Sequence, residues 1–101
     1  MTDAFKQSLR QLAADLKTQR DLRHPYVVKQ NGMTRQTLGE DHFQAMNSER
    51  RLWIERNCSA SVAYDQLPRG AGQKYLFESY YDAIGFKMRF GSRVVPEAEA
   101  R

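Results

Sequence analysis

The fold is decided around residues 24–38, which read HPYVVKQNGMTRQTL. Tyr26, Val27 and Val28 are aromatic or β-branched, and with residues 29–30 they predict a strand. Asn31-Gly32 follows, the most favourable pair for a two-residue hairpin, because a type I′ turn requires positive φ at both central positions. Residues 33–38 are therefore expected to return as the second strand of an antiparallel hairpin.

The residues before this stretch predict an amphipathic helix over residues 3–23. Thr2 and Asp3 are both suitable as its N-cap. Its apolar residues recur at spacings of three and four: Phe5, Leu9, Leu12, Ala13 and Leu16. His24-Pro25 is expected to end the helix, because the residue before a proline is disfavoured in helical geometry.

A second helix is predicted over residues 40–56, directly after Gly39. Acidic residues at its start and basic residues near its end suit the helix dipole. Four residues are expected to mark its buried stripe: Phe43, Met46, Trp53 and Ile54. Five charged residues are expected to be exposed: Glu49, Arg50, Arg51, Glu55 and Arg56.

The remaining residues predict a short helical stretch over 61–67, a loop over 68–73 and a third helix over 74–84 that Gly85 ends. Residues 86–90 alternate apolar and basic side chains, which is typical of a half-buried strand. The expected fold is a single α+β domain over residues 1–94, with about three helices and a small antiparallel hairpin or sheet. Residues 95–101 are expected to form a frayed tail.

Length and composition exclude several classes of protein. The chain has 101 residues, a net charge of +4 and a single cysteine. One cysteine makes no internal disulfide, which fits a reducing cytoplasm. The chain contains no apolar run long enough for a membrane span and no apolar run typical of a signal peptide. We therefore expect a cytoplasmic protein that does not interact with membranes.

The sequence shows no pattern typical of an enzyme. Nothing in their spacing places Cys58 beside His24 or His42 as a nucleophile and base. The acidic residues 40–41 precede His42, but adjacent helical positions point in different directions, so they do not converge on a metal. Gly72-Gln73-Lys74 lacks the spacing of a phosphate-binding loop. We expect no catalytic residue, metal, cofactor or small-molecule substrate.

Charge and aromatic residues are concentrated in the second half of the chain. Residues 50–93 hold eight Lys or Arg and four Asp or Glu, which accounts for the whole net charge of +4. Six of the chain's eleven aromatic residues cluster within residues 75–90 of this region: Tyr75, Phe77, Tyr80, Tyr81, Phe86 and Phe90. Basic residues interleaved with aromatic rings are typical of nucleic-acid-binding surfaces and also of protein–protein hot spots. Both classes of partner stay open at this point.

The segments RRLWIERNC at residues 50–58, LP at 67–68 and GQKYLF at 72–77 resemble small phage excisionases and other MerR-like winged-helix proteins. In that family a basic helix enters the major groove and a glycine-bearing wing contacts the DNA backbone. The resemblance implies a recognition helix with Arg50, Arg51 and Arg56, and a wing with Arg69 and Lys74. Lys87, which lies among the aromatic residues, is a further candidate for nucleic-acid binding.

The profile of a small, slightly basic, non-enzymatic chain with an aromatic-rich second half is similar to the anti-RecBCD accessory proteins of temperate lambdoid phages. That resemblance implies a protein that binds a host recombination nuclease and modulates or inhibits it, and it implies an association with a peptidyl-prolyl isomerase. Pro68, in a glycine-rich loop, is the position on which such an isomerase is expected to act. The expected partner-binding residues are Trp53, Pro68, Arg69, Tyr80, Tyr81 and Arg89.

Overall fold

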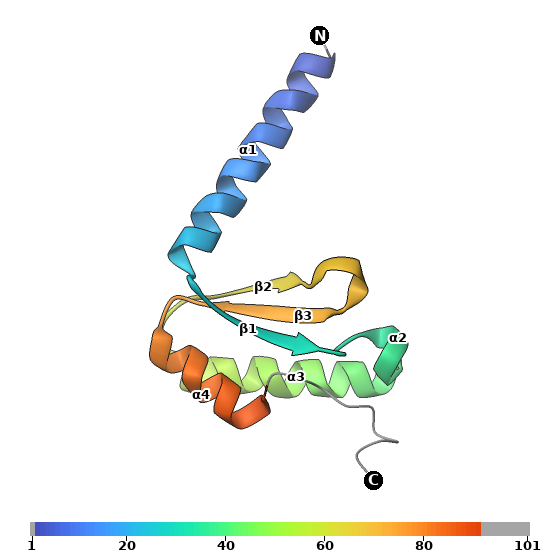
Figure 1. The fold of residues 1–101 in the computed structure, drawn as a ribbon, viewed down its shortest axis with the longest axis vertical. Coiled ribbons are helices and arrows are strands. Elements are labelled where there is room, and N and C mark those ends of the chain that lie inside the picture. Colours follow the sequence, from blue (N-terminus) through green and yellow to red (C-terminus); the bar gives the residue numbers. More distant parts are fainter. Residues whose placement is uncertain (1, 92–101) are drawn as a thin grey trace.

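The computed structural model describes residues 2–91 as a sheet with helices above and below it (Figure 1). The elements in chain order are α1 (Thr2–Arg23), β1 (Tyr26–Asn31), α2 (Arg35–Leu38), α3 (Glu40–Asn57), β2 (Val62–Gln66), the 3₁₀ turn η1 (Pro68–Gly70), β3 (Gly72–Phe77) and α4 (Tyr80–Phe90). The prediction of an α+β fold is confirmed, with a three-stranded antiparallel sheet in the order β1-β3-β2. The expected tail over 95–101 and the expected domain end at 94 lie outside the described residues.

The helix and strand bounds of the first half agree well with the sequence, but the pairing of β1 does not. β1 pairs with β3 along its whole length, from Tyr26 opposite Phe77 to Asn31 opposite Gly72. The predicted hairpin through Asn31-Gly32 is therefore wrong. After the strand the chain enters α2, where the Thr34 side chain accepts a hydrogen bond from the amide of Thr37 and caps the helix. The turn preference of Asn31-Gly32 is therefore outweighed here by pairing with β3, a strand more than forty residues away in the sequence.

Three predictions for the second half are also wrong. Residues 62–66 form strand β2 instead of a short helix, residues 72–77 form strand β3, and residues 86–90 belong to α4. Tyr75, Leu76 and Phe77 are all buried, so β3 lacks the alternation that identifies a half-buried strand. The helix instead begins after Ser79, whose side chain accepts from the amide of Asp82.

Gly85 does not end α4, which continues to Phe90 and stops before Gly91 at a φ of 75°. A Cβ added at Gly85 would lie 3.3 Å from the Trp53 ring, so the glycine lets α4 approach α3 closely. Gly85, which the sequence predicts as the end of a helix, is therefore the position at which α4 packs closely on α3.

The hydrophobic core lies between the sheet and the pair α3 and α4, which cover the same face (Figure 1). Phe86 of α4 is completely buried at its centre, with ring centroids 4.7 Å from Tyr75 and 5.3 Å from Phe77. The other buried members of this core are Val28, Met33, Phe43, Ile54 and Ala83. Helices α3 and α4 are thus fixed to the sheet by aromatic packing.

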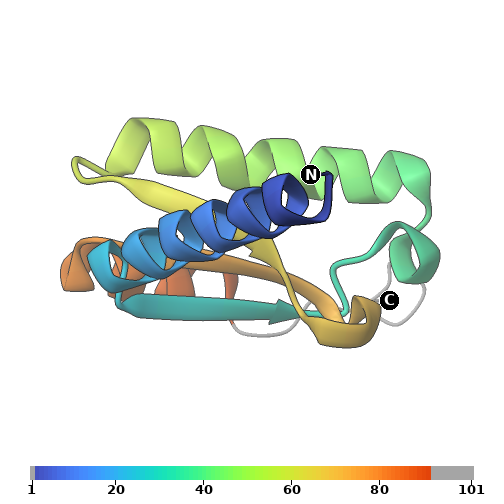
Figure 2. The ribbon, with the colours of Figure 1, turned by 90° about the horizontal axis from the view of Figure 1, so that it is seen from above.

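Helix α1 projects away from the rest of the molecule (Figure 1), and in the view from above it lies in front of the sheet (Figure 2). Among residues 2–91, the contacts that tie α1 to the sheet lie in its last turns: the Arg20 guanidinium donates to the Asp65 carboxylate at 2.9 Å, and Arg23 pairs with Glu78 at 3.1 Å. His24 is buried at the end of the helix, where its Nδ1 donates to the carbonyl of Arg20 at 2.7 Å and its Nε2 lies 2.8 Å from the Ser61 hydroxyl. Polar contacts therefore set the direction of α1.

The Asp65 anchor gives a pH-dependent prediction. The hydrogen bond from Arg20, aided by the Gln66 amide, holds the pKa of Asp65 below its ordinary value. A carboxyl whose pKa is lowered by folding stabilises the native state above its unfolded pKa, and this contribution is lost as the pH falls through the folded pKa. Asp65→Asn is expected to lower the free energy of unfolding by about 0.5–1 kcal/mol at neutral pH, since the pair is partly solvated.

Urea unfolding of both proteins at pH 7 and at about pH 2 would test this, because the lower pH is below the ordinary pKa of aspartate. The difference between wild type and Asp65→Asn should disappear in acid. An equal loss at both pH values would show that the carboxylate charge does not hold α1.

Candidate functional site

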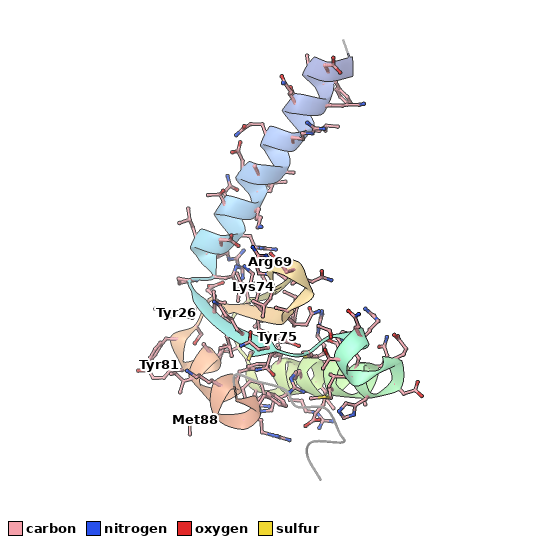
Figure 3. The ribbon with its side chains drawn as sticks, turned by 45° about the vertical axis from the view of Figure 1, so that its right-hand side comes forward. Tyr26, Arg69, Lys74, Tyr75, Tyr81 and Met88 are labelled. Atoms are coloured by element: carbon pink, nitrogen blue, oxygen red, sulfur yellow. The ribbon has the colours of Figure 1, made fainter. Side chains whose placement is uncertain are left out.

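The outward side of α4 carries large apolar side chains that the fold leaves in contact with solvent. Tyr81 is 83% exposed and Met88 is 82% exposed, while Ile84 lies between them on the same side of the helix. Tyr80 and Tyr26 continue this area toward the edge of the sheet. Figure 3 shows Tyr26, Tyr81 and Met88 along one side of the molecule. We call these five residues, Tyr26, Tyr80, Tyr81, Ile84 and Met88, the α4 surface.

The tyrosines of the α4 surface contact one another. The rings of Tyr26 and Tyr80 meet edge to face with centroids 5.4 Å apart, and those of Tyr80 and Tyr81 are 5.8 Å apart. This chain of rings joins α4 to β1, which is an edge strand because it pairs only with β3 among the described strands. Rings held in this way lose little conformational freedom on binding a partner.

Next to the α4 surface lies a shallow hollow between β1 and α4. Val27, Val28, Lys29 and Lys87 line it together with Asn31. Lys87 of α4 therefore adds positive charge at the margin of an apolar area. An apolar centre with a charged margin is the usual composition of a protein interface.

The structure brings together only part of the expected partner-binding set. Tyr80 and Tyr81 belong to the α4 surface, whereas Trp53 is half-buried, with its ring 5.8 Å from that of Phe86 and 6.0 Å from that of Phe90. Trp53 and Arg89 line a second hollow, between α3 and α4. Arg89 is also paired there with Glu49 at 3.0 Å.

Pro68 and Arg69 lie on a third part of the molecule, the turn between β2 and β3. Both are exposed, and Arg69 has a positive φ of 60°. Figure 3 shows Arg69 well away from Tyr81 and Met88. A single partner surface with all six expected residues is therefore not formed. Tyr26, Ile84 and Met88 were missed, because residues 86–90 were interpreted as a strand and the register of β1 was unknown.

Arg50 is the clearest correction among the expected nucleic-acid-binding residues. It is 4% exposed, and its Nε donates to Oε1 of Gln30 at 2.9 Å while its Nη1 donates to the carbonyl of Met46 at 3.2 Å. Its guanidinium lies 4.6 Å from the centroid of the Phe90 ring. Burial lowers the pKa of Arg50 from its ordinary value. The expected exposure of Arg50 is wrong, and the side chain belongs to a polar network inside the fold.

The outward side of α3 is not basic either. Arg51 stacks over the Tyr64 ring at 3.5 Å, and Arg56 is exposed. Four acidic residues on the same helix are also exposed: Glu40, Asp41, Glu49 and Glu55. With Arg50 buried, acidic groups outnumber basic groups on the exposed part of α3, which disfavours contact with a phosphate backbone.

Lys74 lies on the sheet face opposite α3 and α4. The register places it directly beside Lys29 of β1 on one side and Asp65 of β2 on the other. The Asp65 carboxylate is already paired with the Arg20 guanidinium and lies 3.9 Å from the Lys17 ammonium group. Lys29 and Lys74 thus form a small basic area with Arg69 at the nearby turn. Lys29 was missed because its cross-strand neighbour depends on the pairing of β1 with β3.

Within residues 2–91 we find no constellation typical of catalysis. The described part of the chain holds no group of three or more histidine, cysteine or acidic side chains that could bind a metal ion. Burial, with a smaller effect from Asp82, raises the pKa of the Cys58 thiol to about 11. Such a thiol is protonated at neutral pH and is a poor nucleophile.

None of the described helices is long and apolar enough to cross a membrane. Comparison of the chain with protein-family models, with curated proteins and with solved structures gives no significant match.

Proposed function

We propose that the protein is a non-enzymatic binding protein that docks on a larger protein through the α4 surface. The observation that carries this proposal is the exposure of Tyr81 and Met88, at 83% and 82%, on the outward side of α4. Exposed apolar areas of this kind are typical of interaction sites, and tyrosine and methionine are enriched in the centres of protein interfaces.

The resemblance to the phage anti-RecBCD accessory proteins makes a cytoplasmic recombination nuclease that acts on DNA the first partner to test. Modulation or inhibition of that enzyme is the proposed outcome of docking. Pro68 stays a predicted site for a peptidyl-prolyl isomerase. Its exposure in η1, outside the α4 surface, is compatible with simultaneous binding of both proteins.

The double variant Tyr81→Ala/Met88→Ala is expected to bind a purified RecBCD-type nuclease about 30-fold more weakly than the wild type, which is the loss typical of hot-spot side chains. Both side chains are mostly exposed, so the free energy of unfolding should stay within about 0.5 kcal/mol. Fluorescence anisotropy of labelled protein would measure the affinity. Nuclease assays would report whether binding changes the enzyme.

Leu52→Ala is the matched control, because Leu52 is also an exposed apolar residue on a helix but lies outside the α4 surface. It should bind as the wild type does. Equal binding by the wild type and the double variant would exclude the α4 surface, while absence of binding by the wild type would exclude this nuclease.

DNA binding is a second candidate, favoured by the adjacent Lys29 and Lys74 on the sheet and by the glycine-bearing turn with Arg69. The helix α3 followed by the β2–β3 hairpin also has the order that the winged-helix resemblance implies. Binding by this face would be mainly electrostatic. Titration of duplex binding with salt should give a slope of log affinity against log salt that Lys74→Gln reduces by about 0.9, the value for one phosphate contact. A slope unchanged by Lys74→Gln would exclude the basic area.

A further inference from the structure

Helix α1 has an apolar stripe that the described part of the chain leaves uncovered. Phe5, Leu9, Leu12 and Leu16 are each at least half exposed, from 50% for Leu9 to 65% for Phe5. Every described side chain from residue 3 to residue 19 is exposed. The helix therefore extends for several turns without packing against the sheet or the other helices (Figure 1).

Such a helix is poorly stabilised on its own. Most helices in proteins owe their stability to the packing of an apolar face more than to the helix propensity of their residues. The tethering contacts of α1 are polar and lie at its C-terminal end, at Arg20, Arg23 and His24. A partner for the stripe would supply the missing packing.

The spacing of the stripe indicates what the partner is. Phe5, Leu9, Leu12 and Leu16 follow one another at intervals of four, three and four residues. This is the alternation of the d and a positions in a heptad, which buries side chains between two helices that cross at a small angle. We infer that α1 of a second copy of this chain covers the stripe, so that the protein dimerises through a parallel two-helix coiled coil.

The charges beside the stripe select the parallel orientation. One edge of α1 is basic, with Lys6, Arg10 and Lys17, whereas the other edge carries Asp15, which accepts a hydrogen bond from Gln11. In a parallel pair the basic edge of each helix faces the opposite edge of its partner. An antiparallel pair would place the two basic edges together, which is repulsive.

The position of the rest of the molecule allows this arrangement. Lys17 and Arg20, which contact Asp65, lie roughly a quarter turn around the helix from the stripe at 3.6 residues per turn. A two-fold axis along the stripe would therefore place the two sheets on opposite sides of the coiled coil. Two facing stripes bury on the order of 1,000 Å², the lower end of specific interfaces, so a weak dimer is expected.

Cysteine cross-linking tests both the dimer and its orientation. In a Cys58→Ser background, Leu12→Cys should form a disulfide-linked dimer under mild oxidation, because residues at the same d position face each other in a parallel pair. A mixture of Leu9→Cys and Leu12→Cys chains is the matched control. In an antiparallel pair it would form a mixed disulfide in preference to the symmetric one.

Sedimentation of the full chain tests the stripe itself. Leu12→Glu is expected to raise the dimer dissociation constant by about 100-fold or more, since it places two like charges in an apolar interface. Gln7→Glu, on an exposed position away from the stripe, should change it little. Unchanged Trp53 fluorescence would show that the rest of the fold is intact, because that ring packs on Phe86 and Phe90.

A monomeric wild type at high micromolar concentration would overturn the inference, as would preferential formation of the mixed disulfide. So would a dimer that Leu12→Glu does not weaken. None of these results depends on the α4 surface, so the experiments can contradict the dimer without contradicting the proposed function, and the reverse.

Discussion

Gly72→Ala is expected to lower the free energy of unfolding by at least about 3 kcal/mol, one of the largest effects that a single methyl group can have in this fold. Gly72 begins β3 opposite Asn31, at a φ of 150°. A Cβ at this position would lie 2.2 Å from the carbonyl oxygen of Gln30, which is backbone and has no rotamer to change. One of the two strands would have to move, and their pairing holds the sheet together.

Gly70→Ala is the matched control, because this glycine also has a positive φ, at 65°, but a Cβ there meets nothing within 4 Å. Its cost should be only the left-handed backbone penalty of about 1–2 kcal/mol. Urea unfolding monitored by Trp53 fluorescence would compare the two variants. Equal losses would mean that the close approach of β1 and β3 at Gly72 does not limit the fold.

The second large effect is expected for Gln30→Leu, which should cost about 3 kcal/mol by leaving a buried cation short of an acceptor. Gln30 is completely buried, and its side-chain oxygen accepts from Arg50 while its Nε2 donates to the carbonyl of Gly91 at 2.6 Å. Leucine has a similar size but neither hydrogen-bonding group. The destabilisation therefore comes from an Arg50 guanidinium that keeps only part of its hydrogen bonding and from a Gly91 carbonyl that loses its donor.

The double variant Gln30→Leu/Arg50→Met separates this cause from a loss of packing. Removing both polar partners should recover at least about 1 kcal/mol relative to Gln30→Leu alone, because no buried charge is left unpaired. Gln66→Leu is the control, since Gln66 occupies the same register row on β2 but is exposed. Additive losses in the double variant would show that Gln30 and Arg50 are not coupled.

Burial of Arg50 illustrates why the candidate nucleic-acid site could be predicted only in part. In the sequence it is one of two consecutive arginines, but it lies four residues from both Met46 and Ile54, which places it on the predicted apolar stripe of the helix. Its burial follows from the position of Gln30, which faces α3 only because β1 pairs with β3 in one register. Helical spacing therefore predicts where Arg50 points, but its partner Gln30 depends on long-range strand pairing that leaves no local pattern.

The α4 surface shows the same limit. Tyr80 and Tyr81 were identified from their residue type, since tyrosines in a basic region are typical of interfaces. Ile84 shares a side with them in the predicted helix over 74–84, but Met88 joins them only if residues 80–90 form one helix. The local alternation of residues 86–90 favours a strand, but the packing of Phe86 and Phe90 on the sheet and on Trp53 stabilises a helix instead.

Residues 24–38 by themselves determined the end of α1 and the strand β1, because Pro25 disfavours helix before it and Tyr26, Val27 and Val28 favour an extended chain. They did not determine the partner of that strand. Only the tertiary structure decided it. Placing β3 between β1 and β2 buries Tyr75, Leu76 and Phe77, and this burial stabilises the fold more than a turn at Asn31-Gly32 would. The hydrophobic effect outweighed the turn preference, since burying three large side chains is worth several times the free energy of one favourable turn.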